Sequence, residues 1–490
     1  MRASLASSIA VACATALALP VTLAAPATAT ARPAAAALPP TQDELPGSTQ
    51  SLPLRPLGAS VRSFGSDPGA APEQGLTRRD VRPFSLVGVV WNDPAAVLHG
   101  TVQVRTRSAA DGAWSEWQDV ETHNDQHGAD PGTAEGASGT LRGSTAPLWV
   151  GDSDGVEIRV LAEPAGPGAE RATVRLPAGL RLELIDPGEE PAAPAPGPRP
   201  APAPGTRAMA PPAVLTAAEA AASGVNTPLA PYGSTVIPDT LPAAGLDTVQ
   251  GAPIQKEIVR KEIAQEAEVQ KAREAAAQEA AAQAAKAPYI GPRPAIITRK
   301  GWGADESIRE KSFVYTKTIK AAFVHHSATG NNYTCAQAPS VLRSIYRYHV
   351  KSSGWRDFGY NFAVDKCGNI YEGRAGGVAK PVLGAHTLGF NTNSMGVAVL
   401  GTFTSTTPPA AVVTAVARLT AWKLGLHAIN PKGTVTLVSG GGNLYAKGKQ
   451  VRFNAIAGHR DGFATECPGG RLYGKLGTAR TSSAKYQGRS

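Results

Sequence analysis

Long apolar runs are nearly absent from this chain of 490 residues. Only residues 5–25 approach the length that spans a bilayer, so a protein built from several membrane-spanning helices is excluded. Lysine and arginine form no cluster with interleaved aromatic residues, which argues against nucleic-acid binding. The chain also has only 4 cysteines, and no second cysteine pair is available for a closed structural zinc site.

The apolar run at the N-terminus is typical of a secretory signal peptide, which we assign to residues 1–31. Arg2 supplies the positive region, and small residues over 27–31 supply a cleavage site. The alternative is an uncleaved membrane anchor, but Pro20 favours cleavage. We therefore expect a secreted, extracellular protein without stable membrane insertion.

The charge balance is positive, with 48 Lys and Arg against 39 Asp and Glu and a formal net charge of +9. Such an excess favours an anionic partner, for example anionic wall polymers or a membrane surface. A surface charge that only promotes solubility explains the excess equally well.

The length predicts two or three folded units joined by linkers. Residues 32–82 are rich in Ala, Pro, Ser and Gly and are expected to be flexible. Short alternating runs with intervening turn residues predict a smaller all-β domain over 83–187, which we expect to be a sandwich. Residues 188–253 form a Pro/Ala-rich linker, and residues 254–287, which lack Gly and Pro, form a helical spacer.

The β domain contains two tryptophans at close spacing, Trp114 and Trp117. Exposed indole rings would stack on sugar rings and suggest a wall-binding module. The favoured alternative is that one or both fill the core, since tryptophan is usually largely buried.

The region 290–480 combines strand-like and helix-like segments and is followed by a tail over 481–490. Strands are expected at 321–325, 360–364, 369–372 and 394–402, and helices at 338–351 and 409–425. This order predicts an α/β or α+β domain with one sheet, and we assign it as α/β with a mixed central sheet flanked by helices.

The cysteines have separate expected roles. Cys13 lies in the signal peptide, while Cys335 and Cys367 are expected to form a disulfide after export. Cys467 is then left over, and ligation of a metal by its thiolate is one explanation for an unpaired cysteine in a secreted protein.

Two histidines complete a candidate zinc site with Cys467. His325 ends an apolar run, and His459 lies eight residues before Cys467 in a Gly-rich segment. Two nitrogens and one sulfur suit tetrahedral Zn²⁺ and leave a fourth position for water. The spacing alone is weak evidence, because a lone histidine at a strand end is usually a polar cap. His325 and His326 point to opposite faces of a strand, so only one of them can enter a given site.

Seven sequence blocks resemble the family of peptidoglycan recognition proteins and type 2 N-acetylmuramoyl-L-alanine amidases over about 297–476. The blocks are Ile-Thr-Arg-Lys-Gly-Trp-Gly-Ala (297–304), Phe-Val-His-His-Ser-Ala (323–328), Gly-Trp-Arg-Asp-Phe-Gly-Tyr-Asn-Phe (354–362), Gly-Asn-Ile-Tyr-Glu-Gly-Arg (368–374), Gly-Ala-His (384–386), Asn-Ser-Met-Gly-Val-Ala-Val-Leu-Gly (393–401) and the segment 457–470.

The resemblance implies that His325, His459 and Cys467 bind zinc. It also places the tyrosine that assists catalysis at Tyr360. Members that only bind peptidoglycan generally lack the cysteine, so Cys467 favours an enzyme. Phage members have a lysine where this chain has Thr465, which leaves the role of Thr465 as an oxyanion donor open.

The resemblance further implies a substrate groove. Its expected residues are His349, Trp355, Arg374, His386 and Asn393. His349 and Trp355 have core packing as an alternative, and for Arg374 an internal ion pair is slightly favoured over binding of a peptide carboxylate.

The sequence therefore predicts a secreted zinc amidase that acts on peptidoglycan or muropeptides and cleaves the bond between N-acetylmuramic acid and L-alanine. Two alternatives remain open: a module that binds muropeptides without cleaving them, and a zinc peptidase that cuts within the stem peptide.

Overall fold

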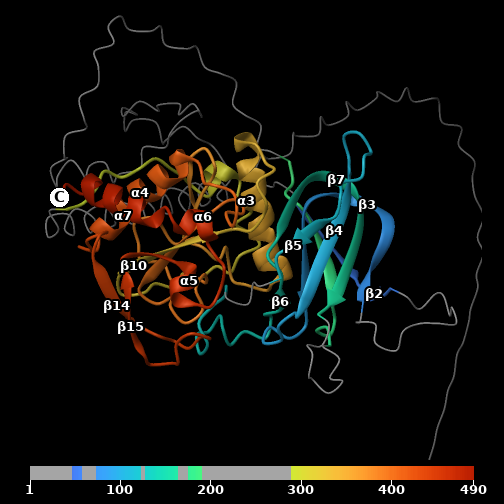
Figure 1. Ribbon diagram of the computed structural model, residues 1–490, viewed down its shortest axis with the longest axis horizontal. Coiled ribbons are helices and arrows are strands. Elements are labelled where there is room, and N and C mark those ends of the chain that lie inside the picture. Colours follow the sequence, from blue (N-terminus) through green and yellow to red (C-terminus); the bar gives the residue numbers. More distant parts are fainter. Residues whose placement is uncertain (1–46, 58–72, 123–126, 164–174, 190–288, 490) are drawn as a thin grey trace, which may run out of the picture. The chain divides into compact units, whose positions relative to one another are not determined.

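The computed structural model describes residues 47–57, 73–122, 127–163, 175–189 and 289–489 (Figure 1). The expected signal peptide and helical spacer lie outside the described residues, as does nearly all of the expected 188–253 linker. Within the described ranges, no helix has the length and apolar character that a membrane crossing requires.

The β domain, as we call the described part of residues 47–189, is an antiparallel, sandwich-like assembly of strands. Its strands are β1 (Ser48–Pro53), β2 (Arg55–Pro56), β3 (Glu73–Trp91), β4 (Gly100–Ser108), β5 (Gln118–Val120), β6 (Gly143–Ser144), β7 (Leu148–Ala162) and β8 (Arg181–Asp186). They follow the order β1-β8-β3-β7-β4-β5, and β2 and β6 both pair with β3. In β4, Val102 and Val104 enter the core while Gln103 and Arg105 remain partly exposed, which is the alternation expected of a half-buried strand.

The β domain begins earlier in the chain than the sequence predicts. Strands β1 and β2 and the start of β3 fall within 32–82, which was expected to be flexible. The β1 sequence lacks a clear alternation of apolar residues, so the pattern of the strand itself gives no signal. It is held instead by antiparallel pairing along its whole length with β8, from Ser48 opposite Asp186 to Pro53 opposite Arg181.

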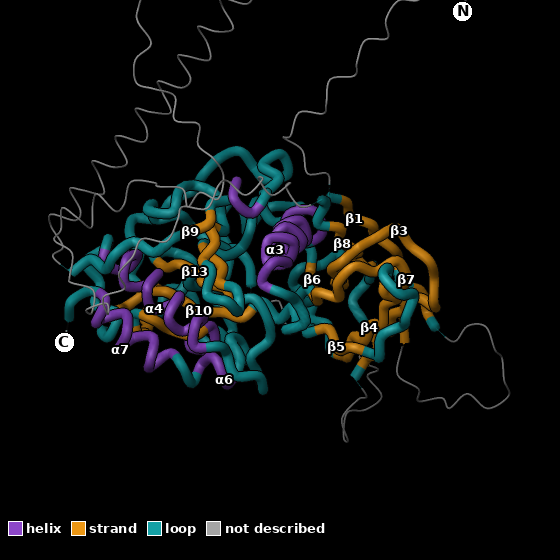
Figure 2. Tube along the Cα trace, turned by 90° about the horizontal axis from the view of Figure 1, so that it is seen from above, coloured by secondary structure: helices purple, strands orange, loops and turns teal. Residues whose placement is uncertain are grey.

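The C-terminal domain, residues 289–489, has the predicted mixed sheet with flanking helices (Figure 2). Its sheet has the order β16-β10-β13-β11-β12-β9, formed by β9 (Ile296–Ile297), β10 (Ala321–His326), β11 (Phe362–Val364), β12 (Ile370–Glu372), β13 (Ser394–Val399) and β16 (Ile456–Gly458). Only the β11–β12 hairpin is antiparallel. The longer helices are α3 (Ala338–Arg347), α4 (Ala410–Gly425) and α7 (Leu476–Tyr486), and β14 (Thr434–Val438) pairs with β15 (Gln450–Asn454) in a separate hairpin.

Two further expectations can be compared with the C-terminal domain. The predicted disulfide between Cys335 and Cys367 is present and joins the start of α3 to the β11–β12 turn. Within the segment 481–490, expected as a tail, α7 continues to Tyr486 and buries Ser483 and Ala484.

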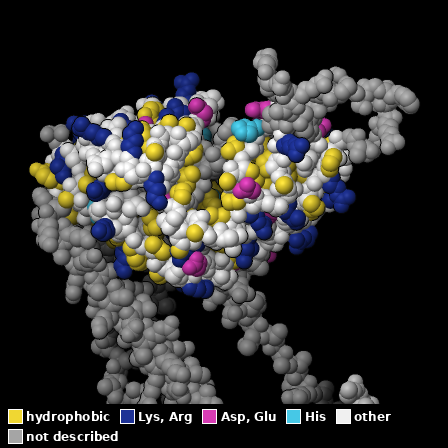
Figure 3. Space-filling view, turned by 90° about the horizontal axis from the view of Figure 1, so that it is seen from below, with side chains coloured by type: hydrophobic (Ala, Val, Ile, Leu, Met, Phe, Trp, Pro, Cys, Tyr) yellow, Lys and Arg dark blue, Asp and Glu magenta, His cyan; other side chains and the backbone are white. Residues whose placement is uncertain are grey.

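Charged side chains of both signs lie on the face of the molecule that Figure 3 draws. Lys and Arg side chains are spread across this face, with fewer Asp and Glu side chains among them. The excess of basic side chains agrees with the formal net charge of +9 of the full chain.

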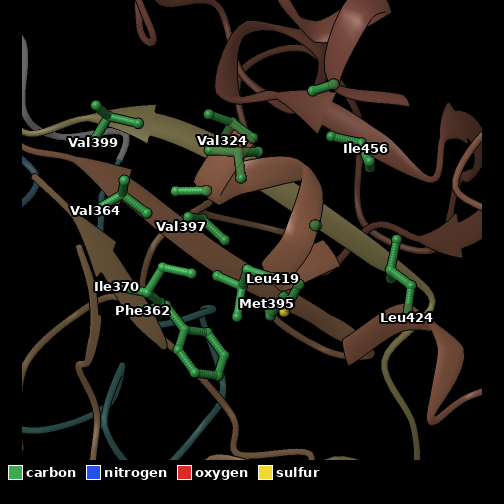
Figure 4. Close-up of a cluster of buried hydrophobic side chains, with 14 of the residues drawn as sticks. Val324, Phe362, Val364, Ile370, Met395, Val397, Val399, Leu419, Leu424 and Ile456 are labelled. Carbon is green, nitrogen blue, oxygen red and sulfur yellow. The ribbon is translucent and has the colours of Figure 1, made fainter. Parts of the chain in front are cut away.

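The central strands of the sheet are buried on both faces, and alternate side chains of each strand belong to opposite faces. Figure 4 shows Val324, Val397 and Leu419 in the cluster that joins the sheet to α4. The opposite face carries Ala363 and Ala398, which pack with α3. Because side chains alternate along a strand, His325 points away from the face of Val324.

Helix α3 also joins the two domains. One buried cluster contains Tyr346 and Tyr348 from the C-terminal domain together with Leu86 and Val90 from β3. The Tyr348 hydroxyl donates to the carbonyl oxygens of Val89 and Thr145 at 3.3 and 3.1 Å. The domains therefore share a core.

Candidate metal centre

Four buried ligand atoms converge at the carboxyl ends of β10 and β16. His127, His325, His459 and Cys467 each offer one nitrogen or sulfur atom, and these atoms all lie within 4.8 Å of one another. Three of the four are the predicted set. His127 comes from the β domain and was not predicted.

The position of His325 follows from its strand. Its Nδ1 faces Cys467, and its Nε2 lies 3.4 Å from the Thr387 hydroxyl, a contact that orients the ring. His326 points to the other face, where its Nδ1 accepts a hydrogen bond from the Phe403 amide at 3.3 Å. The structure therefore brings the first histidine of the pair into the cluster, as the sequence predicts.

His459 directly follows β16, the parallel neighbour of β10. Neighbouring parallel strands end at the same edge of a sheet, so His325 and His459 meet there, with ring centroids 4.4 Å apart. The turn is fixed by Asp461, which accepts hydrogen bonds from the Gly458 amide at 2.9 Å and the Tyr473 hydroxyl at 2.6 Å.

Cys467 is buried, and its Sγ lies 3.8 Å from Nδ1 of His325. Tetrahedral zinc with bonds of about 2.3 Å to sulfur and about 2.0–2.1 Å to nitrogen separates such ligands by about 3.6 Å. The observed spacing therefore fits zinc. The hydroxyl of Thr465 accepts a hydrogen bond from the Cys467 amide at 3.0 Å, so it shapes the cysteine turn.

The electrostatics of the cluster favour metal binding by neutral imidazoles. Burial, reinforced by the neighbouring histidines, lowers the pKa of His325 well below its usual range, and burial lowers the pKa of His127 to about 3. Neutral imidazole is the form that binds a metal. Burial raises the pKa of the Cys467 thiol, and a coordinated cation would reverse that effect by stabilising the thiolate.

Tyr360 lies beside the cluster, with its ring centroid 5.2 Å from that of His325. Burial, and then the neighbouring Cys467, raise the pKa of its phenol well above the usual value. The hydroxyl consequently stays protonated near neutral pH, which suits a hydrogen-bond donor.

The predicted groove residues separate into several groups. His349 stacks on Trp355 at a centroid distance of 4.3 Å, and its Nδ1 accepts a hydrogen bond from the Gly359 amide at 3.2 Å. Both are buried, and the ring centroid of His349 lies 5.9 Å from that of Tyr360. His349 therefore packs between Trp355 and the tyrosine.

Arg374 is buried in an ion pair, the alternative that the sequence slightly favours. Its guanidinium donates to both carboxylate oxygens of Glu135 at 2.7 and 2.9 Å, and its Nε donates to the Phe358 carbonyl oxygen at 2.7 Å. Glu135 belongs to the β domain, so its identity as the partner was not foreseen.

His386 and Asn393 lie in different places. His386 is buried, with its ring centroid 5.3 Å from that of His325 and its Nδ1 3.0 Å from the Thr387 hydroxyl. Asn393 precedes β13, at the strand end opposite His325, and its side-chain oxygen accepts a hydrogen bond from Thr316 at 2.7 Å. The structure does not bring Asn393 to the cluster.

Comparison with known proteins assigns both domains. The N-acetylmuramoyl-L-alanine amidase family matches residues 315–470, and the family described as Rv3811 N-terminal galactose-binding domain-like matches residues 33–196. Peptidoglycan-recognition protein SC2 of Drosophila melanogaster is 30% identical over 183 residues, which cover 37% of this chain and 85% of that protein. The chain belongs to the peptidoglycan-recognition and amidase family.

Other proteins are similar over a comparable share of the chain. The human N-acetylmuramoyl-L-alanine amidase is 31% identical over 191 residues, or 38% of this chain and 28% of that protein. Among solved structures, peptidoglycan recognition protein-LE in complex with tracheal cytotoxin is 29% identical and covers 37% of this chain and 92% of its own, with a TM-score of 0.30.

The unpredicted ligand His127 lies outside the amidase match and within the match to the N-terminal domain. Its ring centroid is 4.6 Å from that of His459 and 5.3 Å from that of His325. The only sequence signal is the occurrence of two of the chain's 9 histidines, His123 and His127, within five residues. Neither the family blocks nor the strand pattern connects this loop to a site about 200 residues away.

Proposed function

We propose that this protein is a secreted, zinc-dependent peptidoglycan hydrolase that cleaves the amide bond between N-acetylmuramic acid and L-alanine. The observation that carries the proposal is the convergence of His325, His459 and Cys467 at one sheet edge in a member of the amidase family. A zinc ion held there would polarise the scissile carbonyl and lower the pKa of a bound water.

The side chains around the cluster support this chemistry. His325 and His459 supply imidazole nitrogens, and Cys467 supplies a soft sulfur ligand. The protonated Tyr360 hydroxyl is suited to donate a hydrogen bond to the oxyanion of the tetrahedral intermediate. Thr465 holds the ligand turn by accepting the hydrogen bond from the Cys467 amide, and its own O–H can still donate to an oxyanion.

Secretion is supported by two independent features. The N-terminal sequence has the composition of a signal peptide. The disulfide between Cys335 and Cys367 is typical of an oxidising, extracytoplasmic compartment.

The alternative of a module that binds without cleaving also has a supporting observation. His127 provides a fourth protein ligand, and a zinc ion with four protein ligands lacks the open position that a catalytic site needs. This observation does not favour the third alternative, a peptidase that cuts within the stem peptide.

Product analysis by mass spectrometry tests the proposal. The mature protein and its His127→Ala variant are each incubated with purified peptidoglycan, with Cys467→Ser as the inactive control. New muramic acid carboxylates and free L-alanine amino termini are expected. Cuts within the stem peptide would favour the peptidase, and the absence of products from both proteins, with zinc bound, would leave the binding module.

A further inference from the structure

The β5–β6 connection of the β domain is docked on the metal centre. We call residues 127–142 of this connection the plug. His127 begins the plug, and its Nε2 atom is buried against the cluster, although the residue as a whole is partly exposed. A strand-connecting loop of one domain thus delivers a ligand atom to a site that belongs to the other domain.

The first anchor of the plug is Asp130, which is buried. One carboxylate oxygen of Asp130 accepts hydrogen bonds from the Gly389 amide at 2.8 Å and the Asn391 side chain at 2.6 Å. The Asn391 side chain also donates to the Gly128 carbonyl oxygen at 2.8 Å. These contacts fix the chain on both sides of residue 129, next to His127.

The second anchor is Glu135. Its carboxylate occupies the guanidinium fork of Arg374 and accepts a further hydrogen bond from the Arg356 amide at 3.2 Å. Both members of the ion pair are buried. While this contact exists, Arg374 cannot offer its fork to an anionic group of a ligand.

The far end of the plug follows the backbone of the C-terminal domain. The Thr140 hydroxyl donates to the Gly354 carbonyl oxygen at 2.9 Å, and the Arg142 amide donates to the Ser353 carbonyl oxygen at 3.1 Å. Gly354 has a φ of 78°, and a Cβ atom there would lie 1.9 Å from the Thr140 carbonyl oxygen. Such a close approach of two backbones requires glycine at this position.

One pocket beside the docked plug has a volume of about 80 Å³ and is lined by Thr133, Glu135, Phe313 and Arg374, among others. Binding sites for small molecules typically have roughly 300–1,000 Å³. This pocket, which Thr133 and Glu135 of the plug line, is too small for a glycan strand with its stem peptide.

We propose that His127 is a fourth metal ligand and that the plug holds the centre in a closed, latent form until the plug is displaced. This inference rests on the proposed function. In the closed form the four protein ligands saturate a tetrahedral ion and leave no position for water. Displacement of the plug removes His127 from the metal and Glu135 from Arg374 together, which opens the coordination position and the groove in one step.

Cobalt substitution tests the ligand without measuring activity. Co²⁺ is loaded into the full-length protein and into His127→Ala, and small anions such as azide are added while the visible spectrum is recorded. Wild-type spectra are expected to stay unchanged, whereas His127→Ala should show new bands as the anion enters the vacated position. Removal of zinc by a chromogenic chelator should be roughly 10-fold or more faster from His127→Ala. An equal response of wild type and variant to azide would overturn the proposal.

The matched control is His99→Ala, since His99 is an exposed histidine of the β domain outside the plug. It should behave as wild type in both assays. Glu135→Gln provides a second variant that retains His127 and loosens only the second anchor. It should give azide sensitivity between those of wild type and His127→Ala, and a wild-type response would contradict the role of the plug as the element that holds His127 in place.

Hydrolysis separates this inference from the proposed function. If both hold, His127→Ala releases stem peptides from peptidoglycan at least 10-fold faster than wild type. If wild type is already as fast as His127→Ala, the closed form is wrong and the amidase stands. If cobalt reports a closed site in wild type but neither protein cleaves peptidoglycan, the fourth ligand stands and the amidase is wrong.

Discussion

At the scale of single residues, the sulfur of Cys467 is the one soft ligand of the cluster and lies in a turn fixed by Thr465. Cys467→Ser replaces it with a hard, weakly acidic hydroxyl that binds zinc poorly. We expect the affinity for zinc to fall by roughly 10–100-fold. Zinc content after gel filtration and the circular dichroism spectrum check this. A variant that stays folded and retains stoichiometric zinc would contradict the assignment.

Substitution of Tyr360 should change the turnover rate rather than the affinity for zinc. Tyr360→Phe keeps the ring packed against His325 and removes only the hydroxyl. Loss of one oxyanion donor should lower kcat by about 10²–10³-fold while KM and zinc content change little. Steady-state kinetics in the His127→Ala background measure this. Tyr445→Phe, in the loop between β14 and β15, is the matched control and should keep full turnover.

The sequence identifies residues whose surroundings are encoded locally. His325 ends a buried strand, and Cys467 lies in a Gly- and Pro-rich block, so short motifs are sufficient to identify them. His127 and Glu135 act through partners more than 180 residues away, and these contacts produce no local pattern. The same limit explains why Arg374 could be assigned to an ion pair without its partner being known.

At the scale of elements, the anchor between Glu135 and Arg374 predicts a pH dependence. Burial alone would raise the pKa of Glu135, but the charge and hydrogen bonds of Arg374 outweigh it and hold that pKa below 4.5. A lowered carboxyl pKa stabilises the fold above pH 4.5, and this contribution is lost as pH falls through the lowered value.

Glu135→Gln should therefore reduce the free energy of unfolding by about 3 kcal/mol at pH 7, because it leaves Arg374 buried without its paired carboxylate. Urea unfolding measures the difference between variant and wild type, which should shrink as pH falls below 4.5. Glu116→Gln, at an exposed position, should change the stability by less than about 0.5 kcal/mol. A difference between Glu135→Gln and wild type that stays constant at acid pH would show that this carboxylate does not carry the effect.

Elements with their own periodicity were predicted, and elements defined by their partners were not. Strand β10 and helix α4 carry continuous apolar patterns, and both were located within one residue of their bounds. Strand β1 depends on its pairing with β8, and the β14–β15 hairpin encloses a Gly-rich loop, so their sequences resemble coil. Propensity is a weak guide where tertiary pairing supplies the hydrogen bonds.

At the scale of the whole molecule, the net charge of +9 and the dispersed Lys and Arg side chains favour anionic wall polymers through long-range attraction (Figure 3). The screening length falls from about 10 Å at 0.1 M salt to about 3 Å at 1 M. Binding of the Cys467→Ser protein to purified walls should therefore weaken several-fold over this range in a sedimentation assay. Walls stripped of anionic polymers are the control, and binding that is insensitive to salt would contradict an electrostatic contribution.

The plug follows β5 and precedes β6, so both of its ends are attached to the β domain. Such a tether gives His127 an effective concentration on the order of millimolar at the metal. A dissolved muropeptide must exceed that concentration to compete, whereas an intact wall presents many scissile bonds within reach of one docked molecule. The length of one loop would thus set the local concentration of substrate above which the protein cleaves it. Released fragments in solution, below that concentration, would not be cleaved.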